Sequence, residues 1–197
     1  MDPKRFAQQI QFVLEIDKEK NILRQTHLSG HGRQENDAEH AWHMAIMIYL
    51  LKEYANEEID VAKAMMMALI HDIVEIDAGD TYAYDTERLA TQKEREEKAA
   101  DRIFGMLPAD QRAELRSLFE EFEAFETPEA KFARAMDNFQ PLLLNASNDG
   151  EDWKAHRVHK SQVVRRQEKT DLGASEIWDY TRAIIEDHVA KGNIQDD

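Results

Sequence analysis

The segment at residues 68–80, ALIHDIVEIDAGD, places polar side chains in an otherwise apolar helical pattern. One face of such a helix would carry the residues at positions i, i+3, i+4 and i+7, which are Ala68, His71, Asp72 and Glu75. Polar groups on a buried helix face are costly unless something binds them. Imidazole and carboxylate groups that share a face can bind a metal ion or exchange protons with a substrate.

Two other helical segments offer polar groups of the same kind. His40 lies in AEHAWH, and Asp137 lies in FARAMDNF on a face that is otherwise apolar. Imidazole and carboxylate ligands together suit Zn, Mn, Fe, Co or Ni better than they suit Ca. Because the chain has no cysteine, a thiolate metal site is excluded. We therefore expect three helices to position a site for a divalent transition metal.

Composition limits the classes of partner. The chain has 197 residues, 42% of them hydrophobic, and a net charge of −15. This charge disfavours a nucleic-acid polymer and an anionic membrane surface as partners. A small anionic ligand requires a metal or a few arginines that reverse the local field. The lack of cysteines and of any signal-peptide or membrane-spanning segment leads us to expect a cytoplasmic protein.

Helix formers dominate the sequence, and no convincing alternating strand pattern is present, so we expect an all-α fold. Helices are expected at about residues 3–17, 36–54, 59–76, 86–107, 109–125, 128–146, 158–167 and 174–189. Asn36 with Glu39, and Thr127 with Pro128, are typical helix starts, and Pro141 should kink or split its helix. Residues 24–36 are expected to form an irregular loop. Amphipathic helices outside the site could form the interface of a homodimer.

The ordered set of His40, His71, Asp72 and Asp137 resembles the motif of the HD-domain metal-dependent phosphohydrolase superfamily. The stretches RQENDAEHAWHMA, ALIHDIVEIDAGDT and EAKFARAMD resemble the 5′-deoxynucleotidase group and its HD-domain-containing protein 2-like relatives. The resemblance covers about residues 5–145. It implies an HD-domain helical bundle with a metal site between helices. A single domain would then span residues 1–197, with C-terminal helices at about 156–190.

The resemblance also implies roles for individual residues. One divalent metal (Mn, Co, Ni, Fe or Zn) would be bound by His40, His71, Asp72 and Asp137. Glu75 would handle the attacking water or protonate the leaving oxygen. A nucleotide substrate would be held at its sugar by Asp80 and Thr81, and at its phosphate by Arg24 and Arg33. No histidine occurs at residues 73–136, which favours a mononuclear site. Gln25 stands where the deoxynucleotidases have tryptophan, so the preference for deoxyribose over ribose stays open.

Each assignment has a structural alternative. The four predicted ligands could form a buried polar network without a metal. Asp80 could belong to an ordinary turn, Glu75 could be an exposed acid, and either arginine could form a surface ion pair. Hydrolysis of a nucleoside 5′-monophosphate is the function that the resemblance implies. The alternatives are hydrolysis of a cyclic nucleotide, an alarmone or a triphosphate, and nucleotide binding without catalysis.

Overall fold

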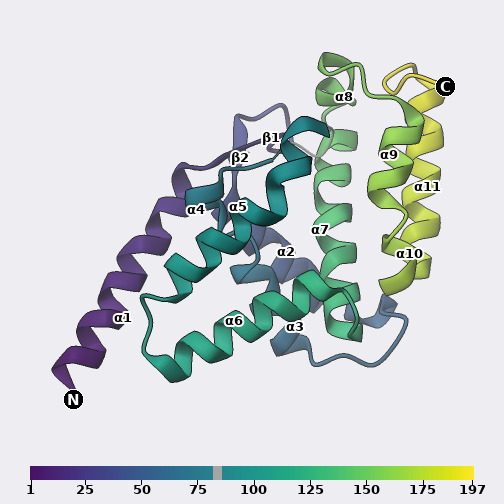
Figure 1. Cartoon of the computed structure of the whole chain (residues 1–197). Coiled ribbons are helices and arrows are strands. Elements are labelled where there is room, and N and C mark those ends of the chain that lie inside the picture. The colour runs from purple at the N-terminus through teal and green to yellow at the C-terminus, as the bar shows by residue number, and fades with distance from the viewer. Residues whose placement is uncertain (82–85) are drawn as a thin grey trace.

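The computed structural model describes residues 1–81 and 86–197 and is mostly helical, with one short two-stranded hairpin (Figure 1). The first half of the chain forms α1 (Pro3–Ile16), η1 (Asp17–Asn21), β1 (Leu23–His27), β2 (Gln34–Asn36), α2 (Asp37–Leu51), η2 (Lys52–Tyr54), α3 (Val61–Ile70), α4 (Glu75–Ala78) and α5 (Thr86–Phe104). The second half forms α6 (Ala109–Ala124), α7 (Pro128–Ser147), α8 (Glu151–Ala155), α9 (Lys160–Gln167), α10 (Thr170–Gly173) and α11 (Ser175–Ala190). The expected all-α class is confirmed.

The helices α2, α3 and α7 pack against one another and form the centre of the molecule (Figure 1). The predicted capping residues at the starts of α2 and α7 are confirmed. Asn36 and Glu39 form a reciprocal capping box at α2, and the Thr127 hydroxyl accepts a bond from the amide of Ala130 at the start of α7, with Pro128 next. Apolar side chains of the three helices share one buried cluster, and this packing fixes the relative positions of the predicted ligands.

Residues 24–36 contain structure where an irregular loop was expected, so that expectation is wrong. The strands β1 and β2 pair antiparallel, with Leu23 opposite Asn36 and His27 opposite Gln34. The buried side chain of Asn148 donates to the backbone carbonyls of His27 and Leu28, which ties the hairpin to the end of α7. This anchor lies 120 residues away in the sequence, so no local pattern announces the hairpin.

The expected helix at residues 59–76 is not continuous either. The α3 helix ends at Ile70, residues 71–74 form a tight turn, and α4 begins at Glu75. Inside the turn the backbone bonds shorten to i→i−3, as in the bond from the Glu75 amide to the Asp72 carbonyl. His71 Nδ1 bonds the Ala68 carbonyl, which Asp72 would otherwise engage in a regular helix. The break in the helix therefore begins at His71 and Asp72, which were predicted from the sequence to be metal ligands.

Pro141 lies inside α7, which continues to Ser147, so the helix is not split. A proline has no amide hydrogen, so Asp137, four residues earlier, lacks the usual helical donor to its carbonyl. The remaining bonds of the helix and its buried surroundings maintain it through this position.

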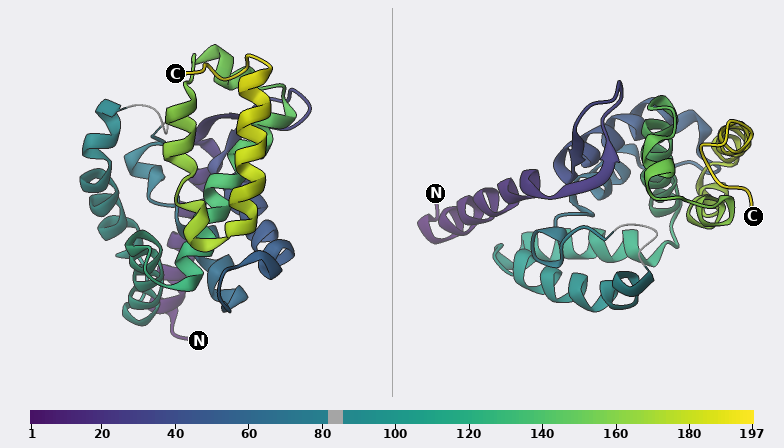
Figure 2. Two further views of the ribbon diagram at one scale, coloured as in Figure 1. Left: turned by 90° about the vertical axis from the view of Figure 1, so that its right-hand side faces the viewer. Right: turned by 90° about the horizontal axis from the view of Figure 1, so that it is seen from above.

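The C-terminal helices α9 and α11 lie beside α7 and cover one side of it (Figures 1 and 2). The Gln167 side chain donates to the Asn138 carbonyl at 2.6 Å, which fixes the end of α9 against the middle of α7. In the described part of the chain, every helix is too short or too polar to cross a membrane.

The first helix projects from the body of the molecule (Figure 2). Phe12 alone among its large apolar side chains is buried, in a cluster shared with α5 and α6. The large apolar side chains that remain exposed on α1 are Phe6, Ile10, Val13 and Leu14. The apolar face of this helix is therefore mostly uncovered within one chain.

Candidate metal centre and its cavity

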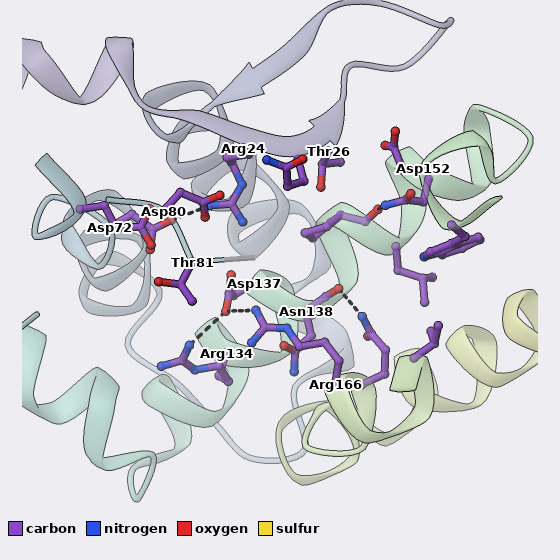
Figure 3. Close-up of a pocket in the computed structure, with 18 of the residues that line it drawn as sticks. Arg24, Thr26, Asp72, Asp80, Thr81, Arg134, Asp137, Asn138, Asp152 and Arg166 are labelled. Carbon is purple, nitrogen blue, oxygen red and sulfur yellow. Dashed lines mark hydrogen bonds and ion pairs between the residues drawn. The ribbon is translucent and has the colours of Figure 1, made fainter. Parts of the chain in front are cut away.

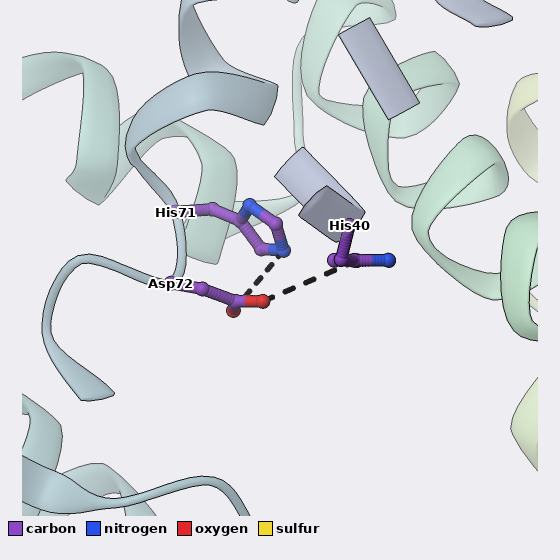
Figure 4. Close-up of side chains that lie close together, drawn as sticks. All are labelled: His40, His71 and Asp72. Carbon is purple, nitrogen blue, oxygen red and sulfur yellow. Dashed lines mark ion pairs between the residues drawn. The ribbon is translucent and has the colours of Figure 1, made fainter. Parts of the chain in front are cut away.

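The four predicted ligands lie together, brought from three separate parts of the chain. His40 comes from α2, His71 and Asp72 come from the turn after α3, and Asp137 comes from α7. His40 Nε2 lies 3.2 Å from Asp137 Oδ1, and His71 Nε2 lies 3.1 Å from Asp72 Oδ1. His71 Nε2 is 3.7 Å from Asp137 Oδ1, and His40 Nε2 is 4.0 Å from Asp72 Oδ2. Figure 4 shows both imidazoles facing Asp72.

Hydrogen bonds on the far side of each imidazole fix its orientation. His71 Nδ1 donates to the Ala68 carbonyl at 2.8 Å, and a carbonyl can only accept. His40 Nδ1 donates to Gln140 Oε1 at 2.9 Å, since the Gln140 amide nitrogen donates to Glu35 at 2.7 Å. In each ring the Nε2 lone pair therefore points at the carboxylates. Such an outer bond is the usual support of a metal-binding histidine.

A buried nitrogen without a hydrogen bond provides the test of fit for a metal. His71 Nε2 is buried and makes no hydrogen bond to any described residue, although the carboxylates of Asp72 and Asp137 lie near it. His40, His71 and Asp72 each present one ligand atom, and these atoms lie within 4.8 Å of one another. Two imidazole nitrogens with carboxylate oxygens form a donor set that first-row transition metals accept. The residues present fit such an ion.

The electrostatics of the cluster favour a positive charge at its centre. Burial lowers the pKa of His71, but the carboxylates of Asp72 and Asp137 outweigh this and raise it to about 10. Burial alone would raise the pKa of Asp137, yet the Arg166 charge and the two adjacent histidines hold it well below its usual range. The pKa of Asp72 is also lowered, chiefly because the charge of His71 overcomes the effect of burial. A bound cation would stabilise the two carboxylates in the same way as a proton on His71 does.

Arg24 lies beside this cluster on β1, nearly enclosed by carboxylates. Its Nη1 lies 2.9 Å from Asp72 Oδ2 and 3.4 Å from Asp37 Oδ1, and its Nε lies 3.8 Å from Glu35 Oε2. Its side chain is only 12% exposed. Three acidic partners thus surround one guanidinium. The arrangement ties the hairpin to the turn that contains His71 and Asp72.

A second group of acids lies next to the first. One carboxylate oxygen from each of Asp37, Glu75 and Asp80 lies within 4.8 Å of the others. Glu75 is buried, and burial together with the charges of Asp72 and Asp37 raises its pKa to about 12. Burial and the Asp72 charge raise the pKa of Asp37 to about 8. Glu75 therefore holds a proton at neutral pH while it faces these neighbours.

Both acidic groups open onto a cavity of about 280 Å³ (Figure 3). Asp80 and Thr81 stand on one side of it, and the Thr81 hydroxyl accepts a bond from Arg95 at 2.8 Å. On the other side, Arg134 of α7 and Arg166 of α9 reach Asp137 (Figure 3). The far end lies between α7, α8 and α9 and is lined by Leu142, Trp153 and Val163. The cavity thus extends from the predicted ligands to an apolar recess.

The structure does not place Arg33 in this cavity. Its side chain is 61% exposed and pairs with Glu39 on the surface. Gln25 does line the cavity, next to Arg24. Nδ1 of the half-buried His43 lies 3.1 Å from the Gln140 amide nitrogen.

Several residues of the site were missed in the sequence. Gln140 follows Asp137 by three positions on the same helix face, so its position near the site could have been predicted from the sequence. The same holds for Arg134, three residues before Asp137. Arg166 lies 29 residues from its partner, and no local signal announces it.

Comparison with known proteins agrees with this geometry. The family model described as HD domain matches residues 16–178, which include all four predicted ligands. The chain belongs to the HD domain family. A solved structure similar to this chain is described as a predicted metal-dependent phosphohydrolase from Magnetospirillum magnetotacticum MS-1. It is 48% identical to this chain, with a TM-score of 0.92, and the match covers 97% of this chain and 96% of that one.

Curated relatives of this HD domain chain are named 5′-deoxynucleotidases. The human 5′-deoxynucleotidase HDDC2 is 30% identical over 126 residues, which cover 64% of this chain and 60% of that protein. The 5′-deoxynucleotidase hdd1 of Schizosaccharomyces pombe is 29% identical over 114 residues, covering 56% of each protein. The chain therefore matches less than two thirds of the length of these two relatives.

Proposed function

We propose that this protein is a metal-dependent phosphomonoesterase that hydrolyses nucleoside 5′-monophosphates, deoxynucleotides among them, to a nucleoside and phosphate. The observation that carries the proposal is the convergence of two buried imidazole Nε2 atoms on two carboxylates, Asp72 and Asp137, that line the cavity. The names of the curated relatives support the choice of substrate. The fold relative from Magnetospirillum supports the class of reaction.

The proposed metal ligands are His40, His71, Asp72 and Asp137, and one ion per chain is proposed. Mn, Co, Ni, Fe and Zn all suit this donor set. When bound, such an ion supplies Lewis-acid activation of a phosphoryl oxygen and a water of lowered pKa. Gln140 and the Ala68 carbonyl hold the two imidazoles in the tautomer that presents Nε2.

Glu75 is the proposed proton-transfer residue. In hydrolysis, a water oxygen forms the new bond to phosphorus, the ester P–O bond breaks, and the leaving 5′-oxygen takes up a proton. A carboxyl group whose pKa is about 12 holds its proton at neutral pH and can donate it to that oxygen. A cation bound nearby favours the ionised carboxylate, which accepts a proton from water. Both roles require Glu75 to face the cavity, and it lines it.

Asp80 and Thr81 are proposed to contact the sugar. Both line the cavity (Figure 3), and Arg95 holds the Thr81 hydroxyl. A role for Arg24 and Arg33 at the phosphate stays a prediction. Arg24 lies at the site but is surrounded by carboxylates, and Arg33 lies on the surface. Gln25 lines the cavity, so the choice between ribose and deoxyribose is a question for matched substrates.

A phosphate-release screen tests this proposal. Protein loaded separately with Mn²⁺, Co²⁺ or Ni²⁺ is given matched ribonucleoside and deoxyribonucleoside 5′-monophosphates, with cyclic nucleotides and nucleoside triphosphates as alternative substrates. The proposal expects phosphate from the monophosphates. Turnover of the cyclic nucleotides to monophosphates, or of the triphosphates alone, detected by separation of the nucleotide products, would assign the site to another phosphate ester. Nucleotide binding without any product would favour a binding protein.

We also propose that the protein forms a homodimer through the exposed apolar side chains of its N-terminal helix. Val13 and Leu14 are 56% and 67% exposed on α1. Apolar surface of this kind is typical of protein interfaces. Sedimentation at several concentrations tests the proposal with the double substitution of Val13 and Leu14 to glutamate, and with Leu172→Glu on α10 as a control of similar exposure. The double variant should be monomeric and the control dimeric.

A further inference from the structure

The arginines that line the cavity differ in the number of carboxylates that surround them. Among the described residues that line it, the only cationic side chains are Arg24, Arg134 and Arg166. Arg24 has three carboxylates within 4 Å and is only 12% exposed. Its guanidinium is already engaged by these acidic neighbours. A phosphate dianion in the cavity therefore gains from positive charge beyond that of Arg24.

Arg134 and Arg166 converge on a single oxygen. Arg134 Nη1 lies 3.1 Å and Arg166 Nη2 lies 3.2 Å from Asp137 Oδ2. The other carboxylate oxygen, Oδ1, faces the two histidines. The guanidinium groups therefore adjoin the predicted ligands directly and line the same cavity (Figure 3). An anion placed in the cavity beside Asp137 would lie next to both of them.

Arg166 keeps N–H donors available, whereas Arg134 is fixed in place. A guanidinium has five N–H donors, and within the described part of the chain Asp137 is the only residue that bonds to Arg166. The Arg166 side chain is 35% exposed. Arg134 is held more firmly, because its guanidinium lies 4.0 Å from the Phe122 ring centroid and donates to Glu123 at 2.7 Å. One arginine is thus oriented in advance and the other is accessible.

The charge of the site requires such residues. The cavity lining includes five acidic side chains, which are Asp72, Glu75, Asp80, Asp137 and Asp152. The chain as a whole has a net charge of −15. A phosphate group is repelled by this field unless cations next to the reaction site reverse it locally. Guanidinium groups suit the task because their donors match the geometry of phosphate oxygens.

We propose that Arg166, together with Arg134, binds the phosphate group of the substrate at the predicted metal centre. The inference rests on the proposed function for the identity of the substrate, but it concerns phosphate as such. It assigns to the C-terminal helix α9 a direct part in substrate binding. In this arrangement α9 forms part of the cavity wall and places Arg166 beside the phosphate.

Binding of inorganic phosphate to metal-loaded protein tests the proposal. The variant is Arg166→Gln, and the matched control is Arg165→Gln, which removes the same charge from the neighbouring position on α9, outside the lining of the cavity among the described residues. Metal content is measured in parallel, because Arg166 contacts Asp137. We expect Arg166→Gln to retain its metal and to bind phosphate about 10–100-fold more weakly, as loss of a charge-assisted bond implies. Arg165→Gln should change phosphate binding less than threefold, and Arg166→Lys should recover part of it.

Two results would overturn the proposal. One is unchanged phosphate affinity in metal-loaded Arg166→Gln. The other is loss of metal with normal phosphate affinity in the molecules that stay loaded, which would mean that Arg166 only orients Asp137. Arg134→Gln provides a second variant with the same expected direction. If wild-type protein hydrolyses no nucleotide but binds phosphate in an Arg166-dependent way, the proposed function fails and the phosphate site stands.

Discussion

Replacement of Gln140 by leucine isolates the hydrogen bonds that orient His40. Gln140 is fully buried, accepts from His40 Nδ1 at 2.9 Å and donates to Glu35 Oε1 at 2.7 Å. Leucine has a similar size, so the change removes the bonds without leaving a large void. Two buried polar groups lose their partner, and each costs about 1–3 kcal/mol. The metal-free protein should therefore lose about 2–6 kcal/mol of unfolding free energy.

The same substitution should weaken metal binding. Removal of the outer partner of a metal-binding histidine typically costs about 10–100-fold in affinity, or about 1.4–2.7 kcal/mol. Urea unfolding of metal-free protein and Mn²⁺ titration measure the two effects separately. Gln167→Leu is the control, because Gln167 is also a buried amide but bonds the Asn138 carbonyl instead of a histidine. It should lose stability and keep its metal affinity. A Gln140→Leu protein that binds Mn²⁺ within twofold of the wild type would refute this account of His40.

Three further outcomes follow from the geometry. Asp72→Ala and Asp137→Ala should each lose both bound metal and phosphate release, measured by elemental analysis and a phosphate assay; an active, metal-loaded variant would remove that residue from the ligand set. Glu75→Ala should keep its metal and lose at least about 100-fold in turnover, the usual contribution of a proton-transfer residue; near-normal turnover would reject its role. The raised pKa of Asp37, about 8, means that its stabilising contribution is complete below about pH 4 and is lost as the pH rises towards 8. Unfolding of metal-free Asp37→Asn between pH 5 and 8 should therefore show a smaller fall in stability than the wild type, and an equal fall would contradict the burial of an uncharged Asp37.

The sequence was most informative where local chemistry decides the structure. The caps at Asn36 and Thr127 follow from side chains that bond amides three residues away, and they form as expected. The meeting of His40 with Asp137 was inferred from residue type and from a familiar order of motifs. The structure brings them to 3.2 Å. Their assignment as metal ligands remains a proposal.

Long-range contacts account for most of what the sequence did not reveal. The hairpin depends on Asn148, which lies more than 100 residues from β1. The break after Ile70 depends on a bond between the His71 side chain and the backbone, which apolar periodicity does not report. Arg166 reaches the site because Gln167 fixes α9 against α7, and neither residue belongs to a recognisable motif. Tertiary packing, rather than local propensity, determines the hairpin and the position of Arg166, whereas the break after Ile70 accompanies a local side-chain bond.

The central claim is that one metal ion, held by two histidines and two aspartates, enables release of phosphate from a nucleotide. The most direct test is the initial rate of phosphate release from a deoxyribonucleoside 5′-monophosphate as Mn²⁺ is titrated into metal-stripped protein. We predict no release without metal and a rise that levels off at one equivalent per chain. Release that is independent of metal, or no release from any common monophosphate at full metal occupancy, would contradict the account.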